Sequence, residues 1–407
     1  MNSRIRVFLE ENIKKTVKET KEDNGTLLAL PFPYTTPCVS NAFQEMYYWD
    51  TYFTNAGLLL MGKTDYVKNN IENMFYMVEK YGFMPNGNRT YYLNRSQPPF
   101  LSEMVKDYYA VTMDKAWLTR AYGILKKEYA FWQSKRITKT GLNGYTGYDL
   151  VESVLDNNYF YFYRRTGRIA KDNPTREEKL KAYYGGVSVY ESGWDCNSRV
   201  KDIGDQYDMI DLNSLLFGME DNMCFFSSEI GVGEEAEWEA KKEKRLKKMQ
   251  HLWHGDRNLF MDRNFLTGEF SAYASAASFY PMYTKVATAE QAKKTMALFE
   301  NLNIAYGISG GEDGDTWHCQ WDYPNVWAPV QFVMYKALKN YGYDSQARSV
   351  AEKFVNLVET NFEKTGNFWE KYNGITGEKA SAESHAEPMI GWTAGTYIFF
   401  NHELGLV

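Results

Sequence analysis

Residues that commonly bind metals are scarce in this chain of 407 residues, which has only four cysteines and five histidines. Cys38, Cys196, Cys224 and Cys319 lie far apart in the sequence, and no pair has the Cys-x-x-Cys spacing of a zinc site. The histidines are equally dispersed. We therefore expect reduced thiols, no metal centre and no cofactor.

Long apolar runs and excess positive charge are also missing. No run approaches the ~18 apolar residues that a membrane-spanning helix needs, and residues 1–11 turn acidic before any apolar core, unlike a signal peptide. The formal net charge of −6 disfavours a nucleic-acid partner. The basic run 241–248 follows the acidic run 234–239, which is typical of a solvated helix with i,i+4 ion pairs. We expect a cytoplasmic protein with no membrane partner.

Linkers, low-complexity tracts and sustained period-2 alternation are absent as well. Apolar residues recur instead at helical spacing, as in residues 5–17 and 67–78. Further apolar stripes follow Asp211 and Asp344, which are candidate N-caps. Loops rich in glycine, asparagine and proline separate these segments. The pattern predicts an all-α protein with a single domain over residues 1–407, and an α/α toroid would place its site where loops meet at one end.

Tryptophan followed by aspartate occurs three times: Trp49-Asp50, Trp194-Asp195 and Trp321-Asp322. An indole ring covers the C–H face of a pyranose, while a neighbouring carboxylate accepts hydrogen bonds from its hydroxyls. The third pair lies in a segment of ten residues, 320–329, that also holds Trp327 and two prolines. These pairs indicate a carbohydrate site.

Hydrolysis of a glycosidic bond needs two carboxyl groups, one protonated and one ionised, on opposite sides of the bond. Asp195 is the best candidate for the acid, because its partly apolar neighbours would raise its pKa by desolvation. The alternative is a helix cap or an ion-pair partner for Arg199.

The partner that we favour is Glu370, which has aromatic residues on both sides and Lys371 beside it. Its alternative is an exposed glutamate paired with that lysine. Asp50 and Asp322 are rivals for either role, and no spacing decides among the four acids. The acidic loop 312–315 lacks the ligand spacing of a calcium loop and is interpreted as an acidic turn.

The ordered motifs resemble those of the trehalases of glycoside hydrolase family 37. Two signature-like stretches run from Phe43 through Trp49-Asp50 to Tyr52, and from Gln320 to Pro329. The segment from Pro85 to Pro99 is similar to the sugar-binding loop of that family. The segments around Asp195 and Glu370 resemble those that carry the catalytic acid and base.

The resemblance implies an (α/α)6 barrel and an inverting mechanism, in which Asp195 protonates the glycosidic oxygen and Glu370 activates water. Inversion predicts that the two carboxyl groups lie about 6.5–9.5 Å apart. The sugar whose bond is cleaved, the −1 sugar, would contact Trp49, Asp50, Asn86, Arg95, Gln97 and Trp321. Further substrate-binding candidates are Phe43, Trp194, Asp322 and Glu383.

The chain departs from the family pattern at three places. Ala42 stands where the family has an arginine, and a Pro-Arg-Pro-Glu motif is missing between residues 150 and 190, where Arg168 is a candidate replacement. The glycine-rich lid is reduced to residues 383–385, although Glu383 keeps its distance from Trp392. These departures would alter the pocket of the leaving group.

We therefore expect an α-glucoside hydrolase that acts on trehalose. The alternatives are a hydrolase of another short α-glucoside or a sugar-binding protein without catalysis, and a purely structural helical protein is disfavoured by the three Trp-Asp pairs. The oligomeric state is not readable from the sequence.

Overall fold

The computed structural model describes residues 1–314, 316, 319–380, 386–388 and 391–406. This part of the chain contains fourteen α-helices and ten strands of two or three residues, so the predicted all-α fold class is confirmed. The helices are α1 (Ser3–Thr16), α2 (Tyr48–Leu60), α3 (Thr64–Tyr81), α4 (Leu101–Thr112), α5 (Lys115–Lys135), α6 (Leu155–Arg165), α7 (Arg176–Glu191), α8 (Ile210–Ile230), α9 (Glu235–Met249), α10 (Tyr280–Tyr283), α11 (Ala289–Leu302), α12 (Ala328–Asn340), α13 (Asp344–Thr365) and α14 (Trp392–Glu403).

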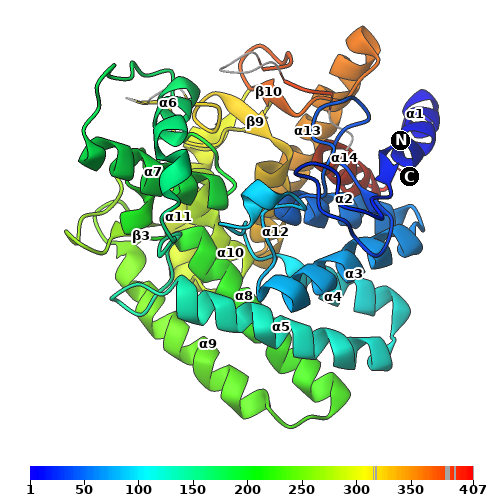
Figure 1. Ribbon diagram of the computed structural model, residues 1–407. Helices are drawn as coiled ribbons and strands as arrows, with labels where there is room; N and C mark the ends of the chain where they lie inside the picture. Colours follow the sequence, from blue (N-terminus) through cyan, green and yellow to red (C-terminus); the bar gives the residue numbers. More distant parts are fainter. Residues whose placement is uncertain (315, 317–318, 381–385, 389–390, 407) are drawn as a thin grey trace.

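Six helices form a closed inner ring. Each of α2, α4, α8, α10, α12 and α14 packs against the next, and α14 returns to α2 (Figure 1). Gly57 and Gly395 allow this last contact, since a Cβ atom on Gly57 would lie 2.6 Å from the Cα atom of Gly395. The helices α3, α5, α9, α11 and α13 follow ring helices in the chain, while α1 lies beside the two termini. The architecture is an (α/α)6 toroid.

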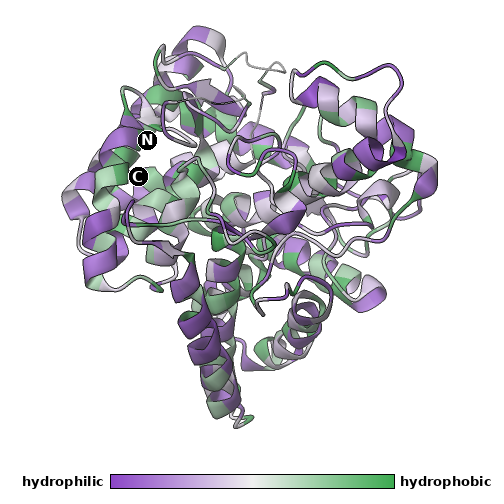
Figure 2. Cartoon of the chain, turned by 90° about the vertical axis from the view of Figure 1, so that its left-hand side faces the viewer, coloured by the Kyte–Doolittle hydropathy of each residue, from purple (hydrophilic) through white to green (hydrophobic). Residues whose placement is uncertain are grey.

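The distribution of apolar residues explains which helices form the ring. The ring helix α8 buries residues around most of its circumference, whereas the outer helix α9 buries only Trp238, Arg245 and Met249. Such an outer helix needs one apolar face and presents charge to solvent. Purple and green residues accordingly alternate around the peripheral helices in Figure 2. One core cluster includes residues from Ile5 to Phe400, which supports the predicted single domain.

Most helix predictions are confirmed, but the predicted N-caps are wrong. The stripe at 67–78 lies within α3, and the stripe at 5–17 lies within α1 except for Val17, which begins β1 (Val17–Lys18). Asp211 and Asp344 lie within the first turns of α8 and α13, where a negative charge complements the helix dipole. The cap positions are Met209 and Tyr343.

The charged run at 234–248 behaves as predicted. Residues 235–249 form α9, and Lys241 and Glu237 make an i,i+4 ion pair with 2.6 Å between Nζ and Oε1. Among the described residues, no helix is both long and apolar enough to cross a membrane.

The strands form five short antiparallel pairs. The pair that matters for the site is β9 (Asn325–Trp327) with β10 (Lys371–Asn373), in which Trp327 lies opposite Lys371. The others are β1 (Val17–Lys18) with β2 (Tyr34–Thr35), β3 (Tyr207–Asp208) with β6 (Arg263–Asn264), β4 (Trp253–His254) with β5 (Leu259–Phe260), and β7 (Asn303–Ile304) with β8 (Gly307–Ile308).

Helices α6 and α7 are additional to the ring and pack against each other on the left of Figure 1. They have small apolar clusters of their own, such as Tyr159 and Phe162 with Ala182. The chain leaves α7 directly into the loop that carries Asp195. This helix pair is therefore placed to shape one wall of the site.

Candidate active site

A cavity of about 780 Å³ brings together residues from distant segments of the chain. Nine of the twelve predicted site residues line it: Phe43, Trp49, Asp50, Asn86, Arg95, Gln97, Asp195, Trp321 and Glu370. They come from the start of α2 and from the loops before α4, α8, α12 and β10. This agrees with the expectation that loops form the site.

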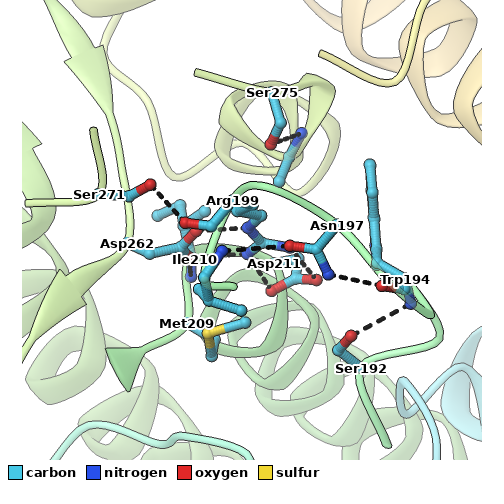
Figure 3. Close-up of polar contacts among 12 residues, drawn as sticks. Ser192, Trp194, Asn197, Arg199, Met209, Ile210, Asp211, Asp262, Ser271 and Ser275 are labelled. Carbon is cyan, nitrogen blue, oxygen red and sulfur yellow. Dashed lines mark hydrogen bonds and ion pairs between the residues drawn. The ribbon is translucent and has the colours of Figure 1, made fainter. Parts of the chain in front are cut away.

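The loop after α7 fixes the position of Asp195. Its Gly193 has φ of +75°, and a Cβ atom there would lie 2.7 Å from the indole of Trp49, so only glycine fits. Farther along, Arg199 is buried between Asp211 and Asp262, donating to both carboxylates (Figure 3). The alternative prediction that Asp195 pairs with Arg199 is therefore wrong.

Asp195 faces the cavity with a side chain that is 37% exposed. The surrounding protein still raises the pKa of Asp195 by desolvation, while the charges of Arg165, Arg95 and Lys371 lower it in part. The nearest of these cations is Arg165, with 3.8 Å between its Nη2 and Oδ2 of Asp195. A raised pKa is what a general acid requires at neutral pH.

Glu370 precedes β10, and its backbone N–H donates to the carbonyl oxygen of Glu387 at 2.9 Å. Its side chain is 12% exposed, so the alternative of a solvent-exposed glutamate is wrong. Burial raises the pKa of Glu370, and the positive charge of Lys371 opposes this rise. The distance between Nζ of Lys371 and Oε2 of Glu370 is 3.7 Å.

Lys371 is itself completely buried and lies over the ring of Trp327. Its Nζ donates to Oε1 of Gln320 at 2.7 Å, and Nε2 of Gln320 donates to the carbonyl oxygen of Asp195 at 3.2 Å. Gln320 therefore connects the segment of Glu370 to the segment of Asp195. These contacts hold the two carboxylates in a fixed relation.

Asp50 lies in the first turn of α2 and lines the same cavity. Burial raises the pKa of Asp50 to about 8, with Glu370 and Asp195 adding to the rise. Its carboxyl group is therefore mostly protonated at neutral pH and can donate a hydrogen bond to a substrate hydroxyl. This distinguishes Asp50 from an ionised base.

Aromatic rings form one wall of the cavity. Trp49 packs against Trp321 at 5.6 Å between ring centroids, and Trp321 stacks on Trp327 at 4.0 Å. The backbone N–H of Trp49 donates to Oε1 of Gln97 at 3.2 Å, which ties this wall to the 85–99 loop. Flat apolar rings beside hydrogen-bonding groups suit a sugar ring.

Two predicted substrate-binding residues lie behind the cavity wall, and their assignment needs correction. Asp322 is fully buried, and its carboxylate accepts from N and Oγ of Ser198 and from N of Cys319 at 2.6–3.0 Å. Trp194 is 1% exposed and packs behind Trp321. Asp322 supports the wall because protein donors already satisfy its carboxylate. Trp194 supports it by packing, although its indole Nε1 has no hydrogen-bond partner among the described residues.

Two predictions about the leaving-group side have different outcomes. Glu383, like His385, lies outside the described residues. Arg168, the candidate replacement for the missing family arginine, pairs with Asp202 at 3.3 Å and does not line the cavity. The arginine that does line it is Arg165, three residues earlier.

The sequence interpretation missed Arg165, Tyr190 and Glu387, all of which line the cavity. The sequence does contain a pattern that points to Arg165. The lining residues of this segment recur every three or four positions, which is the spacing of one helix face: Val151, Val154, Asn158, Tyr161 and Arg165. No comparable pattern marks Glu387, whose position depends on its backbone contact with Glu370.

The described residues contain no group of three or more histidine, cysteine, aspartate or glutamate side chains placed to hold a metal. In the acidic loop, Glu312 accepts from Nη2 of Arg257 and from the backbone N–H of Ala274, as in an acidic turn. Asp315 lies outside the described residues. The four cysteines are present as thiols.

Comparisons with known proteins agree with this geometry. The family model described as Trehalase matches residues 1–405. The periplasmic trehalases of Xanthomonas campestris pv. campestris (strain B100) and Pseudomonas aeruginosa PAO1 are each 33% identical to this chain, over 91% of it and over 68% and 71% of their own lengths. Because the named relatives are periplasmic, they do not confirm the predicted cytoplasmic location.

Solved structures show the same fold. The neutral trehalase Nth1 from Saccharomyces cerevisiae superposes with a TM-score of 0.76 and 26% identity, over 91% of this chain and 73% of that one. The mannosylglycerate hydrolase from Thermus thermophilus superposes with a TM-score of 0.69 at 14% identity, over 97% of this chain and 99% of that one, and indicates the fold alone.

The toroid, the aromatic cavity and the carboxyl groups within it define a glycoside hydrolase. The chain belongs to the trehalase family.

Proposed function

We propose that this protein hydrolyses trehalose to two molecules of glucose with inversion at the anomeric carbon. The observation that carries the proposal is that Asp195 and Glu370, whose pKa values are both raised by burial, line one cavity together with several tryptophans. A small carbohydrate is the substrate class that such a cavity suits. The relatives named trehalases support the choice of trehalose.

In the proposed reaction, Asp195 donates its proton to the glycosidic oxygen as the bond to C1 breaks. Glu370 removes a proton from a water molecule that attacks C1 from the opposite face. Burial raises the pKa of both carboxyl groups, and nearby cations oppose the rise at each of them. Lys371 lies 3.7 Å from Glu370, where its charge favours the ionised form that a base needs.

The −1 sugar would lie against Trp49 and Trp321, with Asp50, Asn86, Arg95 and Gln97 around its hydroxyls. The other side of the cavity, formed partly by α6, would receive the leaving group. Because Ala42 and the missing arginine motif alter that side, another short α-glucoside is the second candidate substrate. Both candidates use the same acid and base.

The roles of the two carboxyl groups are tested with a pair of substrates. Trehalose needs its leaving group to be protonated, whereas α-D-glucosyl fluoride does not, because fluoride departs without a proton. Asp195→Asn should lose trehalose hydrolysis by several orders of magnitude and keep far more of its activity on the fluoride. Glu370→Gln should lose both activities.

The opposite result contradicts the assignment. If Asp195→Asn were equally impaired on both substrates while folded, its role as the acid would be wrong. Trehalose binding by Asp195→Asn without turnover by the wild type would favour the alternative of a sugar-binding protein.

We keep the predicted cytoplasmic location as a separate proposal, which the names of the periplasmic relatives do not support. Fractionation of cells that express the native gene would test it, and activity in the periplasmic fraction would contradict it.

A further inference from the structure

Two arginines lie on the same side of the cavity as the proposed acid. Arg165 is the last residue of α6, and Arg95 lies in the loop after residues 90–92. Both lower the pKa of Asp195, although burial has the larger effect and raises it, and Nη2 of Arg165 lies 3.8 Å from its Oδ2. Tyr190 joins them, with its ring 5.6 Å from the guanidinium of Arg95.

Several polar atoms of this cluster are buried without a hydrogen-bond partner among the described residues. They are Nε of Arg95, Nε of Arg165 and the hydroxyl of Tyr190. A buried donor without a partner costs about 1–3 kcal/mol, and a ligand in the adjoining cavity can supply acceptors to this cluster. Arg165 also contacts the side chain of Cys196, which raises the pKa of its guanidinium group. The side chains all line the cavity.

The charges of the cluster are also incompletely balanced. Arg95 makes no ion pair within the described part of the chain, and its Nη1 donates to the neutral amide of Asn94 at 2.9 Å. Within the same ranges, the ion pair of Arg165 is with Asp195, at 3.8 Å. When Asp195 carries the proton that the reaction needs, this pairing is lost and neither guanidinium group keeps an anion from the described residues.

The cations of the cavity act on both carboxyl groups, since Arg165 also lowers the pKa of Glu370 and Lys371 also lowers that of Asp195. Each cation nevertheless has its own nearest carboxylate: Lys371 lies 3.7 Å from Glu370, and Arg165 lies 3.8 Å from Asp195. The leaving group would lie beside Arg165, because the acid must reach the glycosidic oxygen.

We propose that this enzyme also hydrolyses α-glucosides whose leaving group carries a carboxylate, and that Arg165 binds that carboxylate. The inference rests on the proposed glycosidase function and specifies the substrate class of its leaving-group side. Arginine presents a planar fork of donors that fits a carboxylate. Proton transfer from Asp195 releases a hydroxy acid, and water adds to C1 to give glucose.

The test compares two leaving groups that differ at one carbon, which is a carboxylate in one and a hydroxymethyl group in the other. The substrates are 2-O-α-D-glucosyl-D-glycerate and its neutral counterpart 2-O-α-D-glucosylglycerol, with α-D-glucosyl fluoride as a probe of the −1 side alone. A hydrogen bond to a charged group contributes about 1.5–3 kcal/mol, so kcat/KM should be roughly tenfold or more higher for the glycerate.

Arg165→Gln should remove most of this preference and affect the fluoride much less, whereas Arg165→Lys should retain a preference. The matched control is Arg168→Gln, which removes an arginine that pairs with Asp202 outside the cavity and should keep the wild-type preference. A purely structural role for Arg165 would instead lower activity on all three substrates equally.

The outcomes separate the two proposals. Hydrolysis of the fluoride or of trehalose without any preference for the glycerate would overturn this inference and leave the proposed function standing. Equal loss on all three substrates in folded Arg165→Gln would also overturn it. No activity of the wild type on any of these substrates would contradict the proposed function itself.

Discussion

Lys371 should set the pH range in which Glu370 can act as a base. Its ammonium group is completely buried, 3.7 Å from Oε2 of Glu370, and lowers the pKa of that carboxyl against the larger effect of burial. At an effective dielectric constant of ~20, two unit charges at this separation attract by about 4 kcal/mol. Removing the lysine should therefore raise the pKa of Glu370 markedly.

The variant is Lys371→Met, which keeps an unbranched side chain of similar size and removes its charge. A base acts only when ionised, so the acidic limb of kcat/KM should move to higher pH. The loss relative to wild type should be roughly tenfold or more near pH 5 and should shrink as the pH rises. The assay is the pH profile of α-D-glucosyl fluoride hydrolysis, since this substrate does not need Asp195 as an acid.

Lys379→Met is the matched control, because Lys379 is an exposed lysine of the adjoining segment that lies over the ring of Trp369. Its profile should equal that of the wild type, and near-UV circular dichroism should show both variants to be folded. A folded Lys371→Met enzyme whose acidic limb does not move would refute the reasoning.

Three further predictions concern stability. The pKa of Asp50 is raised to about 8, mainly by burial, so the wild type should lose stability as the pH rises from about 4 through 8. Asp50→Asn should therefore melt at a higher temperature than the wild type at pH 9 but not at pH 4. An equal difference in melting temperature at the two pH values would be inconsistent with this reasoning. Gly193→Ala should lower the free energy of unfolding, measured by denaturant titration, by about 1–3 kcal/mol or more, because φ is +75° and the added Cβ atom would meet Trp49. A change near zero would show that the loop can relax. Arg199→Met leaves two buried aspartates without their cation and should lower the free energy of unfolding by about 3–5 kcal/mol. Arg168→Met removes a partly exposed arginine and should lower it by less than about 1 kcal/mol.

Sequence reasoning reached the fold class because the helices obey a simple periodicity. The stripes at 5–17 and 67–78 report burial on one face directly, and both segments are helical apart from Val17. The caps at Asp211 and Asp344 were wrong because an acidic residue suits both the N-cap and the first turn. At Asp211 a tertiary contact decides, since Arg199 binds its carboxylate.

The sequence also predicted most residues of the cavity wall, since aromatic and polar motifs of the −1 side lie in short segments. The Trp-Asp pattern alone could not separate a carboxylate that faces the cavity from one that holds the wall. Asp195 and Asp322 look alike in sequence, yet Ser198 and Cys319 satisfy the latter completely. Arg165 could not be distinguished from Arg168 without the structure, because their difference depends on which face of α6 and its following turn meets the cavity.

The most direct test of the central claim follows trehalose hydrolysis by proton NMR during the first minutes, before the anomers of glucose equilibrate. Inversion at one anomeric carbon predicts equal initial amounts of α- and β-glucose, with the β-anomer arising from the attacked residue, and no product from Asp195→Asn. Initial formation of α-glucose alone would contradict the inverting mechanism, and the absence of glucose from the wild type would contradict trehalose as the substrate.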